Sequence, residues 1–377
     1  MNRNTMFTLL VSFSLSFLFG FFSPLWTDPA CASPLQEQQK EEKIPKEFLQ
    51  TPEEYFQTEV SKLITIQDPS DVRRLRTKLI TLLWGNPVLP SEGVDSVMQN
   101  YTDERYADIQ SLKSISKMVV KMEFGLESHI YHFNPTVPKN HIVIYHQGHR
   151  GDFIKSKEQI GFFLDHGYPV VAFCMPLLGL NNQPTVYLER FGYLEMTTHD
   201  HLKMLNPQAG HPVKFFVEPI IRTLNYLLES GHSSFSMVGI SGGGWTTTLV
   251  AALDPRILKS FPVAGTYPIY LRSNSQRDWG DYEQNAPAIY RTVNYPELYI
   301  LGSFGENRKQ LQILNQFDSC CFAGPKWETY KDVVRQRVFT LGQGEFDLFS
   351  DDSHYEHMIS GPVMTLILGE LQTIHIK

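Results

Sequence analysis

A serine ringed by glycines follows a short apolar run, and this combination can supply a nucleophile. The run is Phe235-Ser236-Met237-Val238-Gly239-Ile240, and Ser241 and Gly242-Gly243-Gly244 come directly after it. The pattern predicts a buried strand, a sharp turn and a helix, with small residues where the backbone passes close to its neighbours. A serine hydroxyl raised on such a turn attacks an electrophilic carbon once a neighbouring base takes its proton.

An acidic residue that could orient this base follows a later strand. Asp318 ends the strand-like run 311–317. The other candidates are less well placed, because Glu306 lies in an irregular segment and Asp347 lies inside the last predicted strand. We therefore expect Asp318 to hold an imidazole in one tautomer and to stabilise the imidazolium.

Two histidines near the end of the chain are candidates for the base itself. His354 lies a few residues after the last predicted strand, 345–349. His357 stands at the start of the final predicted helix, in His357-Met358-Ile359-Ser360. Either residue could act, because the chemistry requires only a pKa near neutrality and hydrogen-bond reach of the serine hydroxyl.

The segments that must position these residues alternate between strand and helix. We expect strands at 116–124, 128–133, 141–145, 168–174, 235–240, 257–263, 311–317 and 345–349. Helices are predicted at 51–83 in two pieces, after the capping box Ser156-Lys157-Glu158-Gln159, at 217–228, after Ser241, at 326–338 and at the end of the chain. Apolar strands separated by amphipathic helices indicate a parallel sheet covered on both faces. Two irregular segments, 175–212 and 266–308, interrupt the alternation and are predicted to be lid-like insertions.

Taken together, these motifs resemble the α/β-hydrolase superfamily over about residues 115–377. The resemblance rests on Gly239-Ile240-Ser241-Gly242-Gly243, a later acid after a strand and a later histidine before the last helix, in the chain order that this superfamily uses. It implies an α/β-hydrolase fold with a mostly parallel central sheet, and it looks most like secreted or periplasmic serine esterases. The run His357-Met358-Ile359-Ser360 resembles an arrangement of some of these hydrolases, which favours His357 as the base, with His354 as second choice.

The same resemblance assigns an oxyanion hole. The first donor is the backbone N–H of Gly242, the residue after the nucleophile. The second comes from the loop 145–151, Tyr145-His146-Gln147-Gly148-His149-Arg150-Gly151, which resembles the superfamily's His-Gly loop and points to the N–H of His149. This loop departs from the common His-Gly-Gly-Gly form, which leaves the choice of donor within it open.

No cofactor and no metal site are predicted. His146 and His149 lack a third ligand of matching spacing, and His199-Asp200-His201 is interpreted as a polar turn of the lid. Adjacent cysteines cannot easily bridge to each other, so we expect Cys320 and Cys321 to be free or paired elsewhere. Cys174, in an apolar run, is expected to be a buried free thiol.

The net charge limits the classes of partner that the chain can bind, and the N-terminal segment predicts its location. The chain has 377 residues and a net charge of −7, with no basic excess for binding nucleic acid. Arg3, the apolar stretch 6–26 and Ala30-Cys31-Ala32 predict a secretory signal peptide, residues 1–32, cleaved after Ala32, with an N-terminal membrane anchor as the alternative. Residues 33–110 are interpreted as a linker and N-terminal helical appendage, and 111–377 as the hydrolase domain.

The sequence thus predicts a serine hydrolase of carboxylic esters that works through an acyl-enzyme. The substrate is expected to be a small-molecule or polymer-borne ester, and the mature chain is expected to have no membrane span. Two alternatives stay open: an acyltransferase or peptidase that uses the same triad, and a catalytically silent binding protein with a hydrolase fold.

Overall fold

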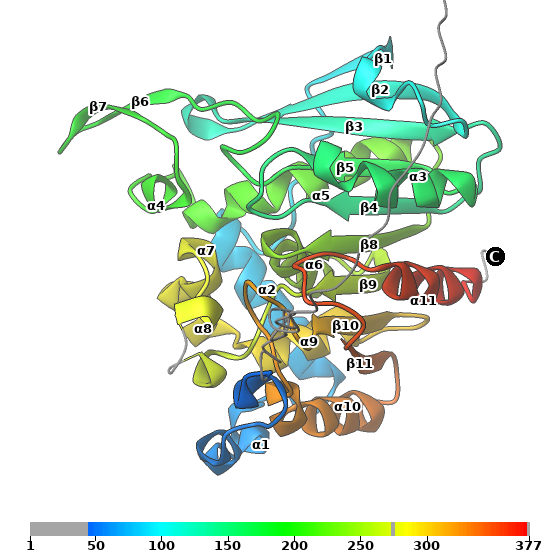
Figure 1. Cartoon of the computed structure of the whole chain (residues 1–377). Coiled ribbons are helices and arrows are strands. Elements are labelled where there is room, and N and C mark those ends of the chain that lie inside the picture. The colour runs from blue at the N-terminus through cyan, green and yellow to red at the C-terminus, as the bar shows by residue number, and fades with distance from the viewer. Residues whose placement is uncertain (1–43, 273–275, 375–377) are drawn as a thin grey trace, which may run out of the picture. The chain divides into compact units, whose positions relative to one another are not determined.

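One sheet carries the residues predicted to do chemistry. In the computed structural model, which describes residues 44–272 and 276–374, this sheet has nine strands in the order β1-β2-β3-β5-β4-β8-β9-β10-β11 (Figure 1). The strands are, in that order, Ser96–Tyr101, Leu112–Lys121, Glu127–Pro135, Val170–Phe173, Ile142–His146, Phe235–Ile240, Ile257–Val263, Lys309–Asn315 and Glu345–Asp351. Pairs from β1 to β5 are antiparallel, and all pairs from β5 to β11 are parallel. The predicted mostly parallel sheet is confirmed.

Helices cover both faces of the sheet, as predicted. On β4, Val143 and Tyr145 belong to one core and Ile142 and Ile144 to the other, because successive residues of a strand point to opposite faces. The first core includes side chains of α3 (Lys157–Asp165) and α11 (Gly361–Gln372). The second core includes side chains of α2 (Pro69–Trp84), α5 (Glu218–Glu229), α6 (Gly242–Leu253), α9 (Tyr295–Ser303) and α10 (Lys331–Thr340).

The helix after the serine is buried along its whole length. All twelve residues of α6 are buried, although its glycines and threonines are poor helix formers. The hydroxyls of Thr246, Thr247 and Thr248 each donate to a backbone carbonyl four residues earlier, at 2.8–3.1 Å. These buried hydroxyls are therefore satisfied inside the helix, which lets α6 pack directly on the sheet.

The N-terminal region contributes to the same compact unit. Contacts join the described residues, 44–272 and 276–374, into one body, and β1 forms an edge of its sheet. Leu79 of α2 is fully buried, and Arg76 donates to the carbonyls of Ala252 and Leu301 at 2.8 and 2.9 Å. The helix expected from Thr51 is divided into the short pieces Glu53–Gln57 and Val60–Leu63 (α1). Part of the expected appendage is thus part of the core.

The two insertions contain more regular structure than expected. The first holds a hairpin of β6 (Thr185–Leu188) and β7 (Gly192–Glu195), which extends away from the sheet in Figure 1, and the short helix α4 (His199–Leu202). The second holds α7 (Tyr282–Asn285), α8 (Pro287–Thr292) and α9. Every residue of α9 is buried, so it lacks the amphipathic period by which a surface helix is found in a sequence.

The predicted signal peptide, residues 1–32, and the alternative of a membrane anchor lie outside the described residues and stay predictions. Among the helices that the structure does describe, none combines the length and the apolar character that crossing a membrane requires.

Three buried histidines make the fold sensitive to mild acid. Burial lowers the pKa of His132, His141 and His146 to about 4, whereas an unfolded chain titrates them near 6.5. Their contribution is fully present above pH 6.5 and is lost as the pH falls from 6.5 towards 4, because only the unfolded chain takes up protons there. We expect the free energy of unfolding to fall between pH 7 and 5 by up to about 1.4 kcal/mol per pH unit for each histidine.

Urea unfolding at a series of pH values measures this slope. His132→Phe should reduce it, since the variant has one titrating group fewer. A free energy of unfolding that is constant from pH 7 to 5 would contradict the prediction.

Candidate active site

Ser241 stands on a strained turn between β8 and α6. Its backbone angles are φ 59° and ψ −125°, a conformation that costs a non-glycine residue free energy and that persists only where the surroundings impose it. The surroundings here are hydrogen bonds from its N–H to the carbonyl of Val263 and from the N–H of Trp245 to its own carbonyl, both 2.9 Å. The predicted strand, sharp turn and helix are confirmed.

The glycines around the serine allow separate backbone segments of the chain to pack in direct contact. A Cβ on Gly239 would lie 2.2 Å from the carbonyl oxygen of Gly243, and one on Gly243 would lie 2.1 Å from that of His146. A Cβ on Gly244 would lie 2.6 Å from the carbonyl oxygen of Val263. Because each obstacle is backbone, these positions have no room for a side chain.

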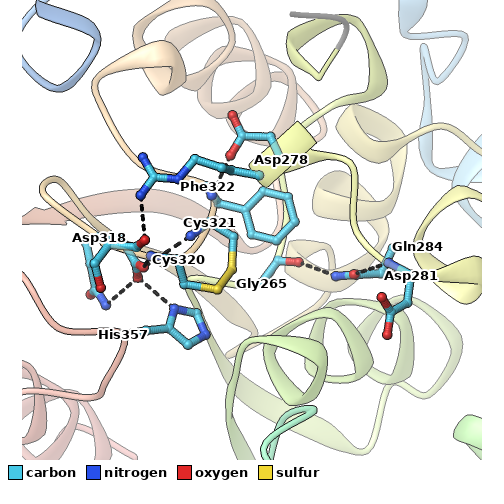
Figure 2. Close-up of a disulfide and its surroundings, with 12 residues drawn as sticks. Gly265, Asp278, Asp281, Gln284, Asp318, Cys320, Cys321, Phe322 and His357 are labelled. Atoms are coloured by element: carbon cyan, nitrogen blue, oxygen red, sulfur yellow. Dashed lines mark hydrogen bonds and ion pairs between the residues drawn. A yellow bond between two sulfur atoms is a disulfide. The ribbon is translucent and has the colours of Figure 1, made fainter. Parts of the chain in front are cut away.

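His357 and Asp318 meet at the same edge of the sheet. Asp318 follows β10, and His357 lies in the segment between β11 and α11. Nδ1 of His357 donates to Oδ2 of Asp318 at 2.7 Å, and the side chains are 2% and 0% exposed (Figure 2). The structure therefore brings together the acid and the preferred histidine that the sequence placed 39 positions apart.

Three further donors hold the Asp318 carboxylate. Its Oδ1 accepts the backbone N–H groups of Cys320 and Cys321 at 2.7 and 3.2 Å, and its Oδ2 also accepts Nδ2 of Asn315 at 3.1 Å. The same amide nitrogen of Asn315 donates to the carbonyl of Met358 at 3.0 Å. Asn315 thus ties the acid to the residue beside His357.

His354 belongs to a different cluster. Its Nε2 lies 3.1 Å from Oδ2 of Asp351, which also accepts the hydroxyl of Ser360 at 2.5 Å, while Oδ1 accepts that of Ser353 at 2.6 Å. Within the described residues, His354 makes no contact with Asp318 that resembles the pairing of His357. The structure therefore places the second-choice base away from the predicted acid.

Ser241 and His357 line one cavity of about 150 Å³, together with the apolar side chains of Ile240 and Ile359. In the part of the chain that the structure describes, Nε2 of His357 has no hydrogen-bond partner although it is buried. Since Nδ1 carries the proton that Asp318 accepts, this Nε2 is left as a free acceptor. An unpartnered acceptor nitrogen is the group that a general base needs.

Comparison with solved structures assigns the fold. No family model matches the chain, and no curated protein matches it in sequence. It is similar to an acetyl xylan esterase from Paenibacillus sp. R4, with a TM-score of 0.54, 15% identity and coverage of 85% of this chain and 98% of the other. It is also similar to acetyl xylan esterase 1 from Thermoanaerobacterium sp. JW/SL YS485, with a TM-score of 0.54, 12% identity and coverage of 85% of this chain and 98% of the other. For Methylesterase BT1017 the TM-score is 0.52 and the identity 14%, with coverage of 84% of this chain and 66% of the other.

The chain has the α/β-hydrolase fold. At these identities the similarity concerns the fold alone. The arrangement of sheet and helices in this chain is the one that the sequence predicted. In this fold the serine elbow lies at the carboxyl ends of the central strands, where the loops after β4, β10 and β11 also converge.

The loop 145–151 packs against the elbow. A Cβ on Gly148 would lie 2.6 Å from Cβ of Ser241, and one on Gly242 would lie 2.5 Å from Cε1 of His149. The two residues predicted to form the oxyanion hole are thus neighbours, and the donor role of their N–H groups stays a prediction. Ser156 was expected to cap α3, but its hydroxyl instead donates to Oε1 of Gln147 at 2.7 Å, so it holds this loop.

The adjacent cysteines correct the sequence prediction. Cys320 and Cys321 are joined by a disulfide next to the acid (Figure 2). Their Cα atoms are only 3.8 Å apart, which is why a bridge was not expected. The chain turns sharply here, with Phe322 at φ 56°, and both N–H groups point at Asp318. Cys174 is free and buried, as predicted.

The imidazole of His149 makes contacts that the sequence did not suggest. Its Nε2 lies 2.8 Å from Oε1 of Glu283 and 3.1 Å from Oδ2 of Asp281, at the start of α7. His199 of α4 faces the same two carboxylates. His199 and the two carboxylates come from separate insertions, and only the folded chain brings them to His149, whose ring lies against Gly242.

Proposed function

We propose that this chain is a serine hydrolase that cleaves carboxylic esters with small acyl groups through an acyl-enzyme. The observation that carries the proposal is the buried 2.7 Å hydrogen bond from Nδ1 of His357 to Asp318, with the opposite nitrogen unpartnered among the described residues. That histidine lines the same cavity as Ser241, whose backbone has the strained geometry of a nucleophile elbow.

Each residue has one role in the proposed reaction. The hydroxyl oxygen of Ser241 attacks the ester carbonyl carbon while Nε2 of His357 takes its proton, and Asp318 stabilises the resulting imidazolium. The N–H groups of Gly242 and His149 receive the developing oxyanion. The imidazolium then returns the proton to the leaving alcohol, and a water molecule activated by His357 releases the acid from the serine.

The size of the cavity supports a small acyl group. A volume of about 150 Å³ corresponds to a molecule of the size of benzene, so a long acyl chain does not fit inside it. The similarity to two acetyl xylan esterases agrees with this choice. Arg150 and Lys155 also line the cavity, so its wall is not purely apolar.

Replacing Ser241 with alanine tests the proposal. We expect the wild type to hydrolyse nitrophenyl esters with a preference for acetate over octanoate, and to gain one adduct with a fluorophosphonate in intact-mass spectra. Ser241→Ala should lose the adduct and about 10⁴- to 10⁶-fold of kcat, because the nucleophile is gone. The matched control is Ser230→Ala, at an exposed serine after α5, which should behave like the wild type.

Two outcomes would overturn the assignment: a wild type that neither hydrolyses esters nor reacts with the probe, or an adduct that persists in Ser241→Ala. Assays with an added alcohol acceptor, read by product analysis, separate hydrolysis from acyl transfer.

A further inference from the structure

Four side chains of metal-ligand type converge beside the predicted oxyanion loop. They are His149 from the loop after β4, His199 from α4 in the first insertion, and Asp281 and Glu283 from the start of α7 in the second insertion. One nitrogen or oxygen atom of each lies within 4.8 Å of the others. The segments that carry them are far apart in the sequence, so the cluster is a product of the tertiary fold.

The hydrogen bonds of His199 leave a lone pair directed at the cluster. Its Nε2 lies 3.0 Å from the carbonyl oxygen of Pro176, which can only accept, so Nε2 carries the proton. In the neutral imidazole Nδ1 is then an acceptor, and it faces Oε2 of Glu283 at 3.2 Å. Both atoms are buried and make no hydrogen bond within the described residues. Two facing acceptors need a cation or a proton between them.

Charge at the cluster also favours a cation. The Glu283 side chain is fully buried, and among the described residues the two carboxylates form ion pairs only with His149 and His199. A buried, ionised carboxylate is costly unless it is paired or binds a metal.

We propose that His149, His199, Asp281 and Glu283 bind a divalent transition-metal ion of the zinc class. Two imidazoles and two carboxylates form a ligand set that suits zinc. Bond lengths near 2.1 Å in a tetrahedral site place the ligand atoms about 3.4 Å apart. The distances between histidine nitrogens and carboxylate oxygens are 2.8, 3.1, 3.2 and 3.7 Å, on either side of that value. Nε2–H of His199 donates a hydrogen bond to the carbonyl oxygen of Pro176. This bond orients the imidazole ring, as a hydrogen bond from the second ring nitrogen does in metal-binding histidines.

The ion has a positioning role that goes beyond the proposed ester hydrolysis. His149 lies against Gly242, so the ion fixes the loop 145–151 next to the elbow. Through His199 and the two carboxylates it also joins both insertions to that loop. Loss of the ion releases the loop 145–151, which lines the cavity, from both insertions, while Ser241 stays in place.

Zinc binding to the purified chain tests the site. After treatment with a chelator and dialysis at pH 7.5, calorimetric titration with zinc chloride should show one ion per chain, and zinc should raise the Tm. Glu283→Gln should weaken binding by at least about 100-fold, since removing a ligand costs more than removing an outer partner. Asp200→Asn is the matched control, because its carboxylate lies on α4 but is exposed and pairs with Lys203.

Absence of zinc binding by the wild type overturns the proposal, as does wild-type affinity in Glu283→Gln. If that variant does not fold, the wild type loaded with Co²⁺ decides the matter. Intense visible bands of a tetrahedral site with histidine ligands support the proposal, and their absence overturns it. The readouts do not involve esters, so a chain that binds zinc without hydrolysing esters refutes the proposed function alone.

Discussion

Replacing His357 with glutamine is expected to lower kcat for ester hydrolysis by about 10⁴- to 10⁶-fold, because it removes the proposed base for the serine proton. The glutamine amide can still donate to Asp318, so the buried carboxylate keeps a partner and the fold is preserved. His354→Gln changes kcat by less than about tenfold, since that residue contacts Asp351 and lies outside the pairing with Asp318. Glutamine at both positions makes the two variants a matched pair.

Steady-state kinetics on a short acyl nitrophenyl ester measure both variants, with circular dichroism to establish that each is folded. The acyl-enzyme step gives a second readout, because His357→Gln should also react slowly with a fluorophosphonate. If His354→Gln is the inactive variant, the geometry has been assigned to the wrong histidine.

Asp318→Asn is expected to lower kcat by about 10⁴-fold through the tautomer of His357. The Cys320 and Cys321 N–H groups need an acceptor, so the amide oxygen stays at the Oδ1 position. The amide nitrogen then faces Nδ1 of His357 and donates to it, which moves the imidazole proton to Nε2. An imidazole with this tautomer cannot accept the proton of Ser241.

The pH dependence separates this mechanism from a loss of fold. If the tautomer of His357 is the cause, kcat of Asp318→Asn should rise with hydroxide concentration, while KM changes little. Asp351→Asn serves as control, because that carboxylate also pairs with a partly buried loop histidine, His354, yet has no contact with His357 in the described structure. It should lose stability and keep kcat. Equal losses of kcat in both variants would refute a specific role for Asp318.

The sequence was sufficient to predict the elbow and the pairing of Asp318 with His357. Ser241 and Asp318 each follow a strand of a parallel sheet, and the carboxyl ends of such strands meet at one edge. Their proximity therefore follows from the fold class alone. The choice of His357 over His354 depends on how the segment after β11 turns, and three residues of sequence separation do not determine this.

Other parts of the site had no local signal. Asp281, Glu283 and His199 lie in insertions that were expected to be irregular, and their approach to His149 depends on how α4 and α7 pack. The disulfide lies in a tight turn whose two N–H groups donate to Asp318, and the sequence gives no local signal for this turn. Helix α9 was missed because a fully buried helix is apolar on all sides.

The close packing of Gly239, Gly243 and Gly244 also affects how the results of a mutational scan of this protein should be interpreted. Any side chain at these positions meets backbone atoms within 2.6 Å, so every substitution should reduce the yield of folded protein. Such a scan would score the three glycines as severely as Ser241, although none of them takes part in the chemistry. Abundance measured alongside activity distinguishes the two classes, because Ser241→Ala should accumulate normally while the glycine variants are depleted from the cell.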